Sequence, residues 1–275
     1  MKQRHGKELS FNNLLDLNVA VDFIKDFENP AAVIIKHNNP TGLAEDKKLS
    51  VAYAQALKCD PLSAFGGIIG LNRIVDAATA KAISKSGFME CIIAPEFDAP
   101  AFEILSQKKN VRLITFDPAN MQDDKYDFKK VVGGLLLQDK DTKIVDPKDW
   151  KVVSRIKPAK MQWDAMVFGW KVIRNAKSNA IFLVKGKKTV GIGCGQTSRV
   201  DSAITAFRKA GKEAKGSTLI SDAFLPKADT VTLAAKAGVK AIVQTGGSIE
   251  DANVIKEADK RRIVMVFTGI RHFKH

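Results

Sequence analysis

A lysine and a histidine end the first strongly apolar run of the chain. In AAVIIKHNNPTG, residues 31–42, aliphatic residues give way at Lys36 and His37 to polar and turn-forming ones. Partial burial would lower the pKa of Lys36 towards neutrality, and a histidine titrates near neutrality without any shift. Either side chain could transfer a proton at pH 7, provided that the chain turns here, because consecutive strand side chains point to opposite faces. The Asn-Asn-Pro-x-Gly sequence predicts that turn; the alternative is a surface lysine beside a capping histidine.

A glycine-rich segment, TVGIGCGQTSR at residues 189–199, lies between an expected strand and an expected helix. Position 196 is glutamine where the dinucleotide fingerprint requires glycine, so a nicotinamide enzyme is not expected. Free N–H groups of the loop, together with Gln196, Ser198 and Arg199, could hold an anion or a polar ligand edge. The alternative is that the glycines only ease a tight turn.

Aromatic and charged residues occur in three further expected loops. Phe65 precedes two glycines in DPLSAFGG, where a flat ligand could approach the backbone, although Phe65 could equally enter the core. SDAFLP, residues 221–226, follows an expected strand, and in α/β sheets such loops carry ligands. The C-terminal FTGIRHFKH places Arg271 and Phe273 where they could clamp a phosphate and stack on a heterocycle; the alternative is a solvated tail.

Composition indicates a globular protein without a membrane span. Of the 275 residues, 45% are hydrophobic and 27% charged, no apolar run approaches the length of about 20 residues that a span needs, and the N-terminus lacks the apolar core of a signal peptide. We therefore expect a cytoplasmic protein without a membrane partner. The cysteines, Cys59, Cys91 and Cys194, are widely separated, so buried thiols are expected rather than disulfides or a metal knuckle.

The net charge of +14, from 44 Lys and Arg against 30 Asp and Glu, would suit nucleic acid, an acidic membrane surface or anionic small substrates. The basic residues are dispersed, and no long basic run contains interleaved aromatic residues. Nucleic-acid binding is therefore not expected.

Strand-like and helical patterns alternate along the whole chain, which predicts an α/β fold. The expected helices are 13–26, 49–58, 76–87 opened by Asp76, 100–108, 160–177, 201–210, 230–237 and 249–261. The expected strands are 32–35, 65–71, 91–94, 111–116, a hairpin over 180–193 with a Gly-Lys turn, 218–221, 241–244 and 263–267. A charged stretch with two prolines at 139–160 predicts a division into domains 1–155 and 156–275, and their shared rhythm suggests a duplication.

Seven segments in this order resemble the transformylase part of the bifunctional AICAR transformylase/IMP cyclohydrolase family: GKELSFNNLLD, IIKHNNPTG, CDPLSAFGGIIGLNR, KSNAI, GIGCGQTSR, SDAFLP and MVFTGIRHFKH. The resemblance spans nearly the whole chain. It implies two cytidine-deaminase-like α/β/α domains with mixed sheets and a homodimer with sites between subunits. It also implies transfer of the formyl group of 10-formyltetrahydrofolate, the cosubstrate, to the 5-amino group of AICAR in purine biosynthesis.

The resemblance also implies roles for individual residues. His37 would take the proton from the amine, and Lys36 would assist proton delivery to the folate nitrogen and stabilise the tetrahedral intermediate. The positions that match the AICAR site are Asn13, Asn179, Phe224, Arg271 and Phe273. Those that match the folate site are Leu62, Phe65, Arg199, Pro226 and Asp229. Some members bind a potassium ion near the positions of Ser178 and Asp222. The zinc motif of deaminases, H-x-E with P-C-x-x-C, does not occur in the sequence.

The sequence departs from the family pattern in two ways. It begins beyond an Arg-Tyr-Gly-x-Asn-Pro segment and an upstream cyclohydrolase domain, so we expect no IMP cyclohydrolase activity and a possible separate cyclohydrolase partner. The stretch between Arg199 and Ser221 is also shorter than in many relatives. An alternative is a relative that has lost its chemistry and binds a nucleotide or a nucleic acid.

Overall fold

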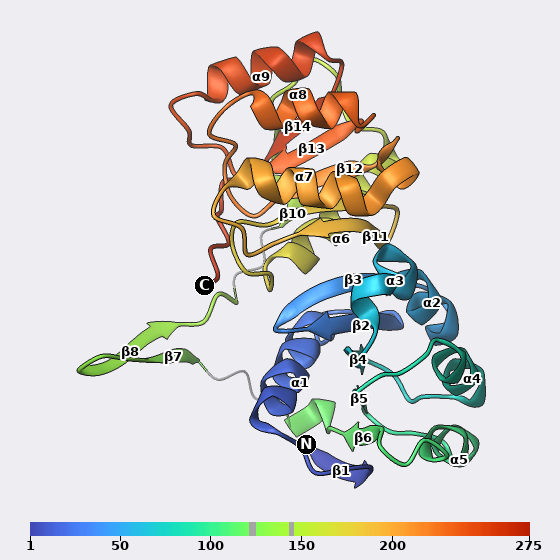
Figure 1. Ribbon diagram of the computed structural model, residues 1–275. Helices are drawn as coiled ribbons and strands as arrows, with labels where there is room; N and C mark the ends of the chain where they lie inside the picture. The colour runs from blue at the N-terminus through green and yellow to red at the C-terminus, as the bar shows by residue number, and fades with distance from the viewer. Residues whose placement is uncertain (121–124, 143–145) are drawn as a thin grey trace.

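One mixed sheet runs through the whole molecule in the computed structural model, which describes residues 1–120, 125–142 and 146–275 (Figure 1). Within these residues twelve strands follow the order β1-β6-β5-β4-β2-β3-β11-β10-β12-β13-β14-β9. The first half contributes β1 (Lys2–His5), β2 (Ala31–Lys36), β3 (Asn39–Glu45), β4 (Ile68–Leu71), β5 (Cys91–Ala94) and β6 (Arg112–Thr115). The second half contributes β9 (Lys151–Val152), β10 (Ile181–Lys185), β11 (Lys188–Gly193), β12 (Thr218–Ser221), β13 (Ala241–Gln244) and β14 (Val264–Phe267).

The two halves repeat one strand order. Each has an antiparallel hairpin, β2–β3 or β10–β11, followed by three mutually parallel strands and an antiparallel strand at the edge. The hairpins meet where β3 pairs with β11, and the hydroxyl of Thr189 exchanges hydrogen bonds with the backbone of Leu43 there, at 2.9 and 3.1 Å. This repetition agrees with the rhythm seen in the sequence.

Helices cover both faces of the sheet. They are α1 (Phe11–Ile24), α2 (Leu49–Cys59), α3 (Pro61–Ala64), α4 (Ala77–Lys85), α5 (Ala99–Ser106), α6 (Lys160–Ile173), α7 (Arg199–Ala210), α8 (Asp229–Lys236) and α9 (Asp251–Lys260), with short 3-10 helices η1 (Pro118–Asn120), η2 (Pro147–Asp149) and η3 (Gly211–Ala214). The predicted start at Asp76 is confirmed, because its side chain accepts from the Thr79 amide at 2.8 Å. The mixed α/β fold predicted from the alternation is likewise what the structure shows.

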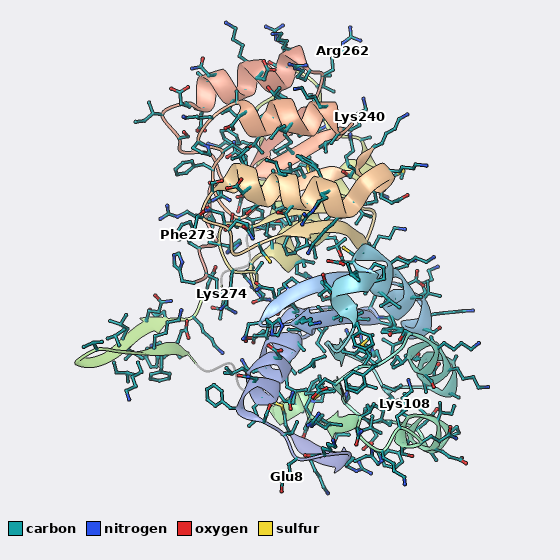
Figure 2. The ribbon with its side chains drawn as sticks, in the orientation of Figure 1. Glu8, Lys108, Lys240, Arg262, Phe273 and Lys274 are labelled. Carbon is teal, nitrogen blue, oxygen red and sulfur yellow. The ribbon has the colours of Figure 1, made fainter. Side chains whose placement is uncertain are left out.

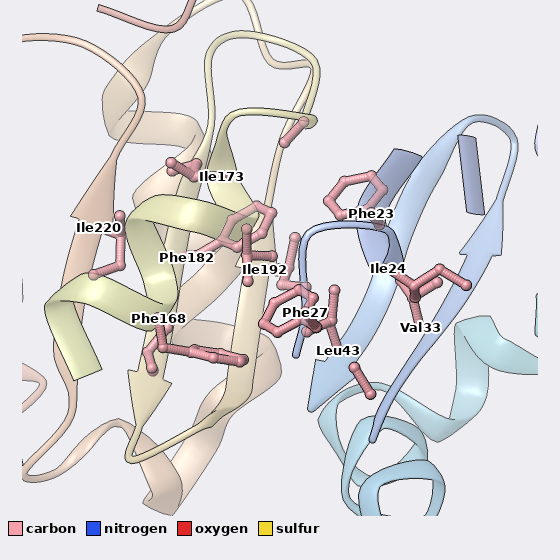
Figure 3. Packing of buried hydrophobic residues seen from close by; sticks show 14 of the residues in the cluster. Phe23, Ile24, Phe27, Val33, Leu43, Phe168, Ile173, Phe182, Ile192 and Ile220 are labelled. Atoms are coloured by element: carbon pink, nitrogen blue, oxygen red, sulfur yellow. The ribbon is translucent and has the colours of Figure 1, made fainter. Parts of the chain in front are cut away.

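A single core joins the halves on one face of the sheet. It contains buried residues of α1 and α6 together with strand residues of both halves. Figure 3 shows Phe27 and Leu43 of the first half facing Phe168 and Ile192 of the second, and the rings of Phe27 and Phe168 are 5.7 Å apart. Separate cores lie on the other face, under α2, α4 and α5 in one half and under α7, α8 and α9 in the other.

Strand β3 lies where the sequence predicted only a turn. The expected turn is confined to His37 and Asn38, and Asn39–Glu45 continues as a strand. Pro40 is tolerated because the register shifts between Ile34 and Ile35, at the place where Pro40 pairs.

The sequence also did not predict a hairpin that lies outside the main sheet. β7 (Tyr126–Val131) and β8 (Gly134–Asp139) form a two-stranded sheet, here termed the arm, which extends away from both halves (Figure 1). Among the described residues of the arm none is fully buried. Residues 143–145 of the charged stretch predicted at 139–160 lie outside the described residues.

Two glycines allow helices to approach the central hairpins closely. A Cβ atom on Gly42 would lie 2.0 Å from the carbonyl oxygen of Ala56 in α2, and one on Gly193 would lie 2.0 Å from that of Ser202 in α7.

We expect Gly42→Ala and Gly193→Ala each to lower the free energy of unfolding by about 1–3 kcal/mol, because the neighbouring helix must move away. Urea denaturation measures this. Gly134→Ala in the arm, where nothing lies within 4 Å of the added atom, should change the free energy by less than about 0.5 kcal/mol.

The boundary between domains near residue 155 remains a proposal, as do the two cytidine-deaminase-like units. β9 lies just before this boundary and pairs with β14 of the second half. No helix within the described residues has the length and apolar character needed to cross a membrane.

Candidate functional site

Lys36 and His37 lie at the tip of the β2–β3 hairpin. Lys36 ends β2 and pairs with Asn39 at the start of β3, so His37 and Asn38 form a two-residue turn. Their φ angles are 53° and 60°, the left-handed conformation that a type I′ turn requires at both central positions. Because the chain turns here, Lys36 and His37 line the same cavity instead of facing opposite sides of the sheet.

This cavity, here termed the Lys-His cavity, has a volume of about 370 Å³. Both halves of the chain build it. Its lining consists of Lys36, His37, Asn39, Pro40, Thr41 and Ser63 from the first half and Ile192, Gly193, Cys194, Gln196, Thr205 and Lys209 from the second. The Nζ atom of Lys36 donates to the carbonyl oxygen of Phe65 at 2.6 Å, which fixes the lysine beside the loop at 60–67.

Lys209 of α7 ties the second half to this loop. Its Nζ lies 2.9 Å from a carboxylate oxygen of Asp60, and the other oxygen of Asp60 accepts from the Ser63 amide at 3.0 Å. Burial by itself would raise the pKa of Asp60, but the hydrogen bonds from Lys209 and Ser63 outweigh it and the pKa is lowered. The carboxylate therefore stays charged and holds Lys209 in the cavity wall.

Cys194 also lines the cavity, as a partly buried free thiol. Burial raises its pKa from 9.0 to about 11, which lowers the thiolate fraction at pH 8 by roughly a hundredfold. Burial also raises the pKa values of Cys59 and Cys91 to about 12.

Because the pKa values of the three thiols are raised, we expect no fast reaction with Ellman's reagent at pH 8 in the native chain. The reaction should become faster as the pH rises, and all three thiols should react in guanidinium. Rapid reaction of one thiol in the native protein would contradict this.

Four residues predicted for three different ligands form one polar network around the buried pair of Arg199 and Asp222. The guanidinium of Arg199 pairs with Asp222 and donates from Nη2 to Asn179 Oδ1 at 2.8 Å. Its Nη1 also donates to Ser221 Oγ at 3.2 Å. The hydroxyl of Ser178 donates to the other carboxylate oxygen of Asp222. Because Asp222 is 0% exposed, its charge depends on these partners.

The same network holds the glycine-rich loop. The side-chain amide of Asn179 donates to the carbonyl oxygens of Gln196 at 3.0 Å and Thr197 at 3.3 Å. Asn179, expected at the nucleotide, and Arg199, expected at the folate, are therefore in direct contact. Their network supports the loop that carries Gln196 into the Lys-His cavity.

A potassium ion near Ser178 and Asp222 stays a prediction. Both carboxylate oxygens of Asp222 accept hydrogen bonds, and the guanidinium of Arg199 already balances the charge. This arrangement does not favour a second cation at the carboxylate, and potassium has no role in the function proposed below.

The C-terminal segment brings Phe273, but not Arg271, to the wall of a second cavity, of about 420 Å³. Figure 2 shows Phe273 and Lys274 on the segment that leaves the second half near the arm. Phe273 lines the second cavity together with Asn38, and the guanidinium carbon of Arg271 lies 5.0 Å from the centre of the Phe273 ring. Arg271 is not among the described residues that line either cavity. The β2–β3 turn thus presents His37 to one cavity and Asn38 to the other.

His272 anchors this segment, and sequence reasoning missed it. Its backbone N–H donates to the Asp222 carbonyl oxygen at 3.0 Å, its Nδ1 lies 2.6 Å from Asp141 Oδ2, and its ring centre is 5.0 Å from that of Trp170. These contacts fix the position of His272, which lies between the predicted site residues Arg271 and Phe273.

The remaining residues predicted for the folate are exposed, and they lie in or next to α3 and between β12 and the start of α8. Leu62 and Phe65 are 87% and 60% exposed, and the Phe65 ring is 5.9 Å from that of Phe88. Pro226 and Asp229 are exposed beyond β12. Leu62 and Phe65 together form an exposed apolar surface beside two glycines, on which a flat ring could pack. The folate-binding roles of all four residues remain predictions.

The last two residues predicted for the nucleotide differ from one another in their surroundings. Phe224 is half-buried after β12. Asn13 is buried, and its Oδ1 accepts from the Ser10 amide at 3.1 Å within the N-terminal capping box of α1. The structure therefore gives Asn13 a structural contact beside its predicted role.

Within the described part of the chain, no group of three or more His, Cys, Asp or Glu side chains could hold a metal ion. The side chains that line the Lys-His cavity include an imidazole and two ammonium groups, which can transfer protons, and the amide of Gln196, which can donate hydrogen bonds.

Comparisons with known proteins point to one family. A model described as AICARFT/IMPCHase bienzyme matches residues 1–209. The chain is 48% identical over 274 residues to the bifunctional purine biosynthesis protein PurH of Thermoanaerobacter sp. (strain X514), covering 100% of this chain and 53% of that protein. Its likeness to the PurH of Bacillus subtilis (strain 168) has the same extent and identity. To that of Lysinibacillus sphaericus (strain C3-41) it is 48% identical over 273 residues, 99% of this chain and 54% of the relative. The chain thus spans about half the length of the curated relatives it matches.

Proposed function

The chain belongs to the AICARFT/IMPCHase bienzyme family, and from that membership we propose that it is a cytoplasmic formyltransferase of purine biosynthesis. It moves the formyl group of 10-formyltetrahydrofolate to the 5-amino group of AICAR. The observation that carries this proposal is the left-handed turn that brings the side chains of Lys36 and His37 into one cavity.

His37 acts as the general base. The amine nitrogen of AICAR attacks the formyl carbon, a new C–N bond forms, and the imidazole accepts the proton that the amine loses. A histidine suits this role because its ordinary pKa lies near the working pH. His37 is exposed at the tip of the turn, so an incoming amine can reach it.

Lys36 serves the leaving group. When the tetrahedral intermediate collapses, the bond from the formyl carbon to the folate nitrogen breaks and that nitrogen takes up a proton. Lys36 is held by the Phe65 carbonyl oxygen at 2.6 Å, at the loop predicted to contact the folate. Its ammonium group can stabilise the oxyanion and assist the proton transfer.

Positive charge and flat side chains suit both substrates. AICAR carries a phosphate and the folate carries carboxylates, and the chain has a net charge of +14. Arg271 and Phe273, stacked at 5.0 Å, are proposed to receive the nucleotide, with Asn13, Asn179 and Phe224. Phe65 is proposed to contact the folate, together with Leu62, Arg199, Pro226 and Asp229.

We also propose a homodimer, and the arm supports it. In its register Tyr126, Phe128, Leu135 and Leu137 share one face, because directly opposed residues lie on the same side. All four side chains are exposed, by 39%, 56%, 62% and 56%. Since an isolated two-stranded sheet is only marginally stable in water, this face needs a partner surface. Light scattering at micromolar concentration should give twice the chain mass.

The activity is tested by mixing the purified chain with AICAR and 10-formyltetrahydrofolate and following the release of tetrahydrofolate by absorbance. Turnover that requires both substrates is expected. Absence of turnover, combined with salt-sensitive binding of DNA or RNA and no binding of AICAR, would overturn the proposal in favour of a nucleic-acid-binding relative.

A further inference from the structure

The turn that presents His37 has an unfavourable sequence for its conformation. Type I′ turns need positive φ at both central residues and therefore prefer Asn-Gly. Here the residues are His37 and Asn38, at φ 53° and 60°. Asparagine tolerates this region better than most residues and histidine is also enriched there, but neither matches glycine. Such a conformation persists only when its surroundings hold it.

A carboxylate on α1 supplies that support. The backbone N–H of Asn38 donates to Asp16 Oδ1 at 2.7 Å. A bond from an amide to a charged acceptor is stronger than one between neutral groups. Asp16 is itself half-buried and sits on a firmly placed helix, since the next residue, Leu17, is 0% exposed and Ser10 caps the helix start.

The turn is thus held from two sides. On one side α1 holds the Asn38 amide through Asp16, and on the other side the Phe65 carbonyl oxygen holds the Lys36 ammonium group. His37 lies between these two points and its own side chain is exposed. The direction of the imidazole therefore depends on the backbone of the turn.

We propose that Asp16 is a positioning residue for the transfer reaction: by accepting the Asn38 N–H it keeps the turn left-handed, so that His37 faces the Lys-His cavity. This inference rests on the proposed function, because it assigns Asp16 a role through the proposed base. Asp16 itself is not required to touch either substrate.

Four variants test the proposal: Asp16→Ala, Asp16→Asn, Asn38→Gly and the double variant Asp16→Ala/Asn38→Gly. Asp16→Ala removes the acceptor and is expected to lower kcat between about 10-fold and 100-fold, because small displacements of a catalytic group have large effects. The KM for AICAR should stay within about twofold, since ground-state binding is unchanged. Asp16→Asn retains an oxygen acceptor and should keep most of the activity.

The double variant separates conformation from other effects. Glycine adopts the left-handed region freely, so Asn38→Gly should restore part of the kcat that Asp16→Ala loses, while having a small effect alone. Recovery supports a role through the turn. A kcat that is equal in Asp16→Ala and the wild type, or a loss that Asp16→Asn shares in full, would overturn the proposal.

A measurement without substrates distinguishes this inference from the proposed function. Amide hydrogen exchange followed by NMR on the native chain should show the Asn38 N–H protected in the wild type and in Asp16→Asn, and exposed to exchange in Asp16→Ala. This result supports the positioning contact even if the chain shows no formyl transfer. Unchanged protection of Asn38 in Asp16→Ala would overturn it even if transfer is fast.

Discussion

His37→Asn is expected to lower kcat for formyl transfer by about 10²–10⁴-fold, the contribution of a positioned general base. Asparagine removes the imidazole but tolerates the left-handed conformation observed at φ 53°. The turn and the cavity should therefore remain, and the loss can be assigned to the missing base. Steady-state kinetics with both substrates measure kcat and KM separately.

His37→Ala should lose as much activity and also loosen the turn, since alanine is strained at positive φ. His5→Ala is the matched control. His5 lies on β1 at the far edge of the sheet, where its ring contacts the Val111 carbonyl oxygen, and its replacement should leave kcat within about twofold. A kcat for His37→Asn within a few-fold of the wild type would show that another group accepts the proton.

Arg199→Met is expected to lower the free energy of unfolding by about 3–5 kcal/mol, the usual effect of leaving a buried charge without its partner. The Arg199 and Asp222 side chains are only 6% and 0% exposed. Removal of the guanidinium leaves the Asp222 carboxylate with Ser178 as its remaining side-chain donor among the described residues. Guanidinium or thermal denaturation measures the change.

Two further variants make this expectation specific. Arg199→Met/Asp222→Asn should be more stable than Arg199→Met alone, because the uncompensated charge is gone. Arg4→Met breaks the ion pair between Arg4 and Glu96, in which the side chains are 38% and 50% exposed. This change should lower the free energy of unfolding by less than about 1 kcal/mol. Similar losses for Arg199→Met and Arg4→Met would contradict the view that burial makes the first pair important.

Local sequence patterns predicted most of the elements that depend on local physics. Asp76 was expected to open a helix, and it caps α4. The Gly-Lys hairpin turn was expected, and Gly186 and Lys187 lie between β10 and β11. Strand β3 was missed because Asn39 and Pro40 are turn-forming types, and their pairing with Lys36 and Ile35 of β2 makes them part of a strand.

The arm was missed for a different reason. Its strands lie outside the main sheet and bury no residue fully within the described chain. The apolar residues Leu135, Leu136 and Leu137 are consecutive in β8 and lie on both of its faces, so this strand lacks the alternation that marks one buried face.

The order of amino acids specified the chemical types at the candidate site and their place at strand ends: a lysine and histidine pair, an aromatic residue before glycines, and an arginine near a phenylalanine close to the C-terminus. Which of these residues meet follows from the folded arrangement. Lys36 contacts Phe65, Asn179 contacts Arg199, and His272 contacts Asp141, at separations of 29, 20 and 131 residues. These contacts arise from the order of strands in the sheet, and the left-handed turn at His37 and Asn38 is held by Asp16 of α1. Local propensity encodes neither, because both depend on partners that are distant along the chain.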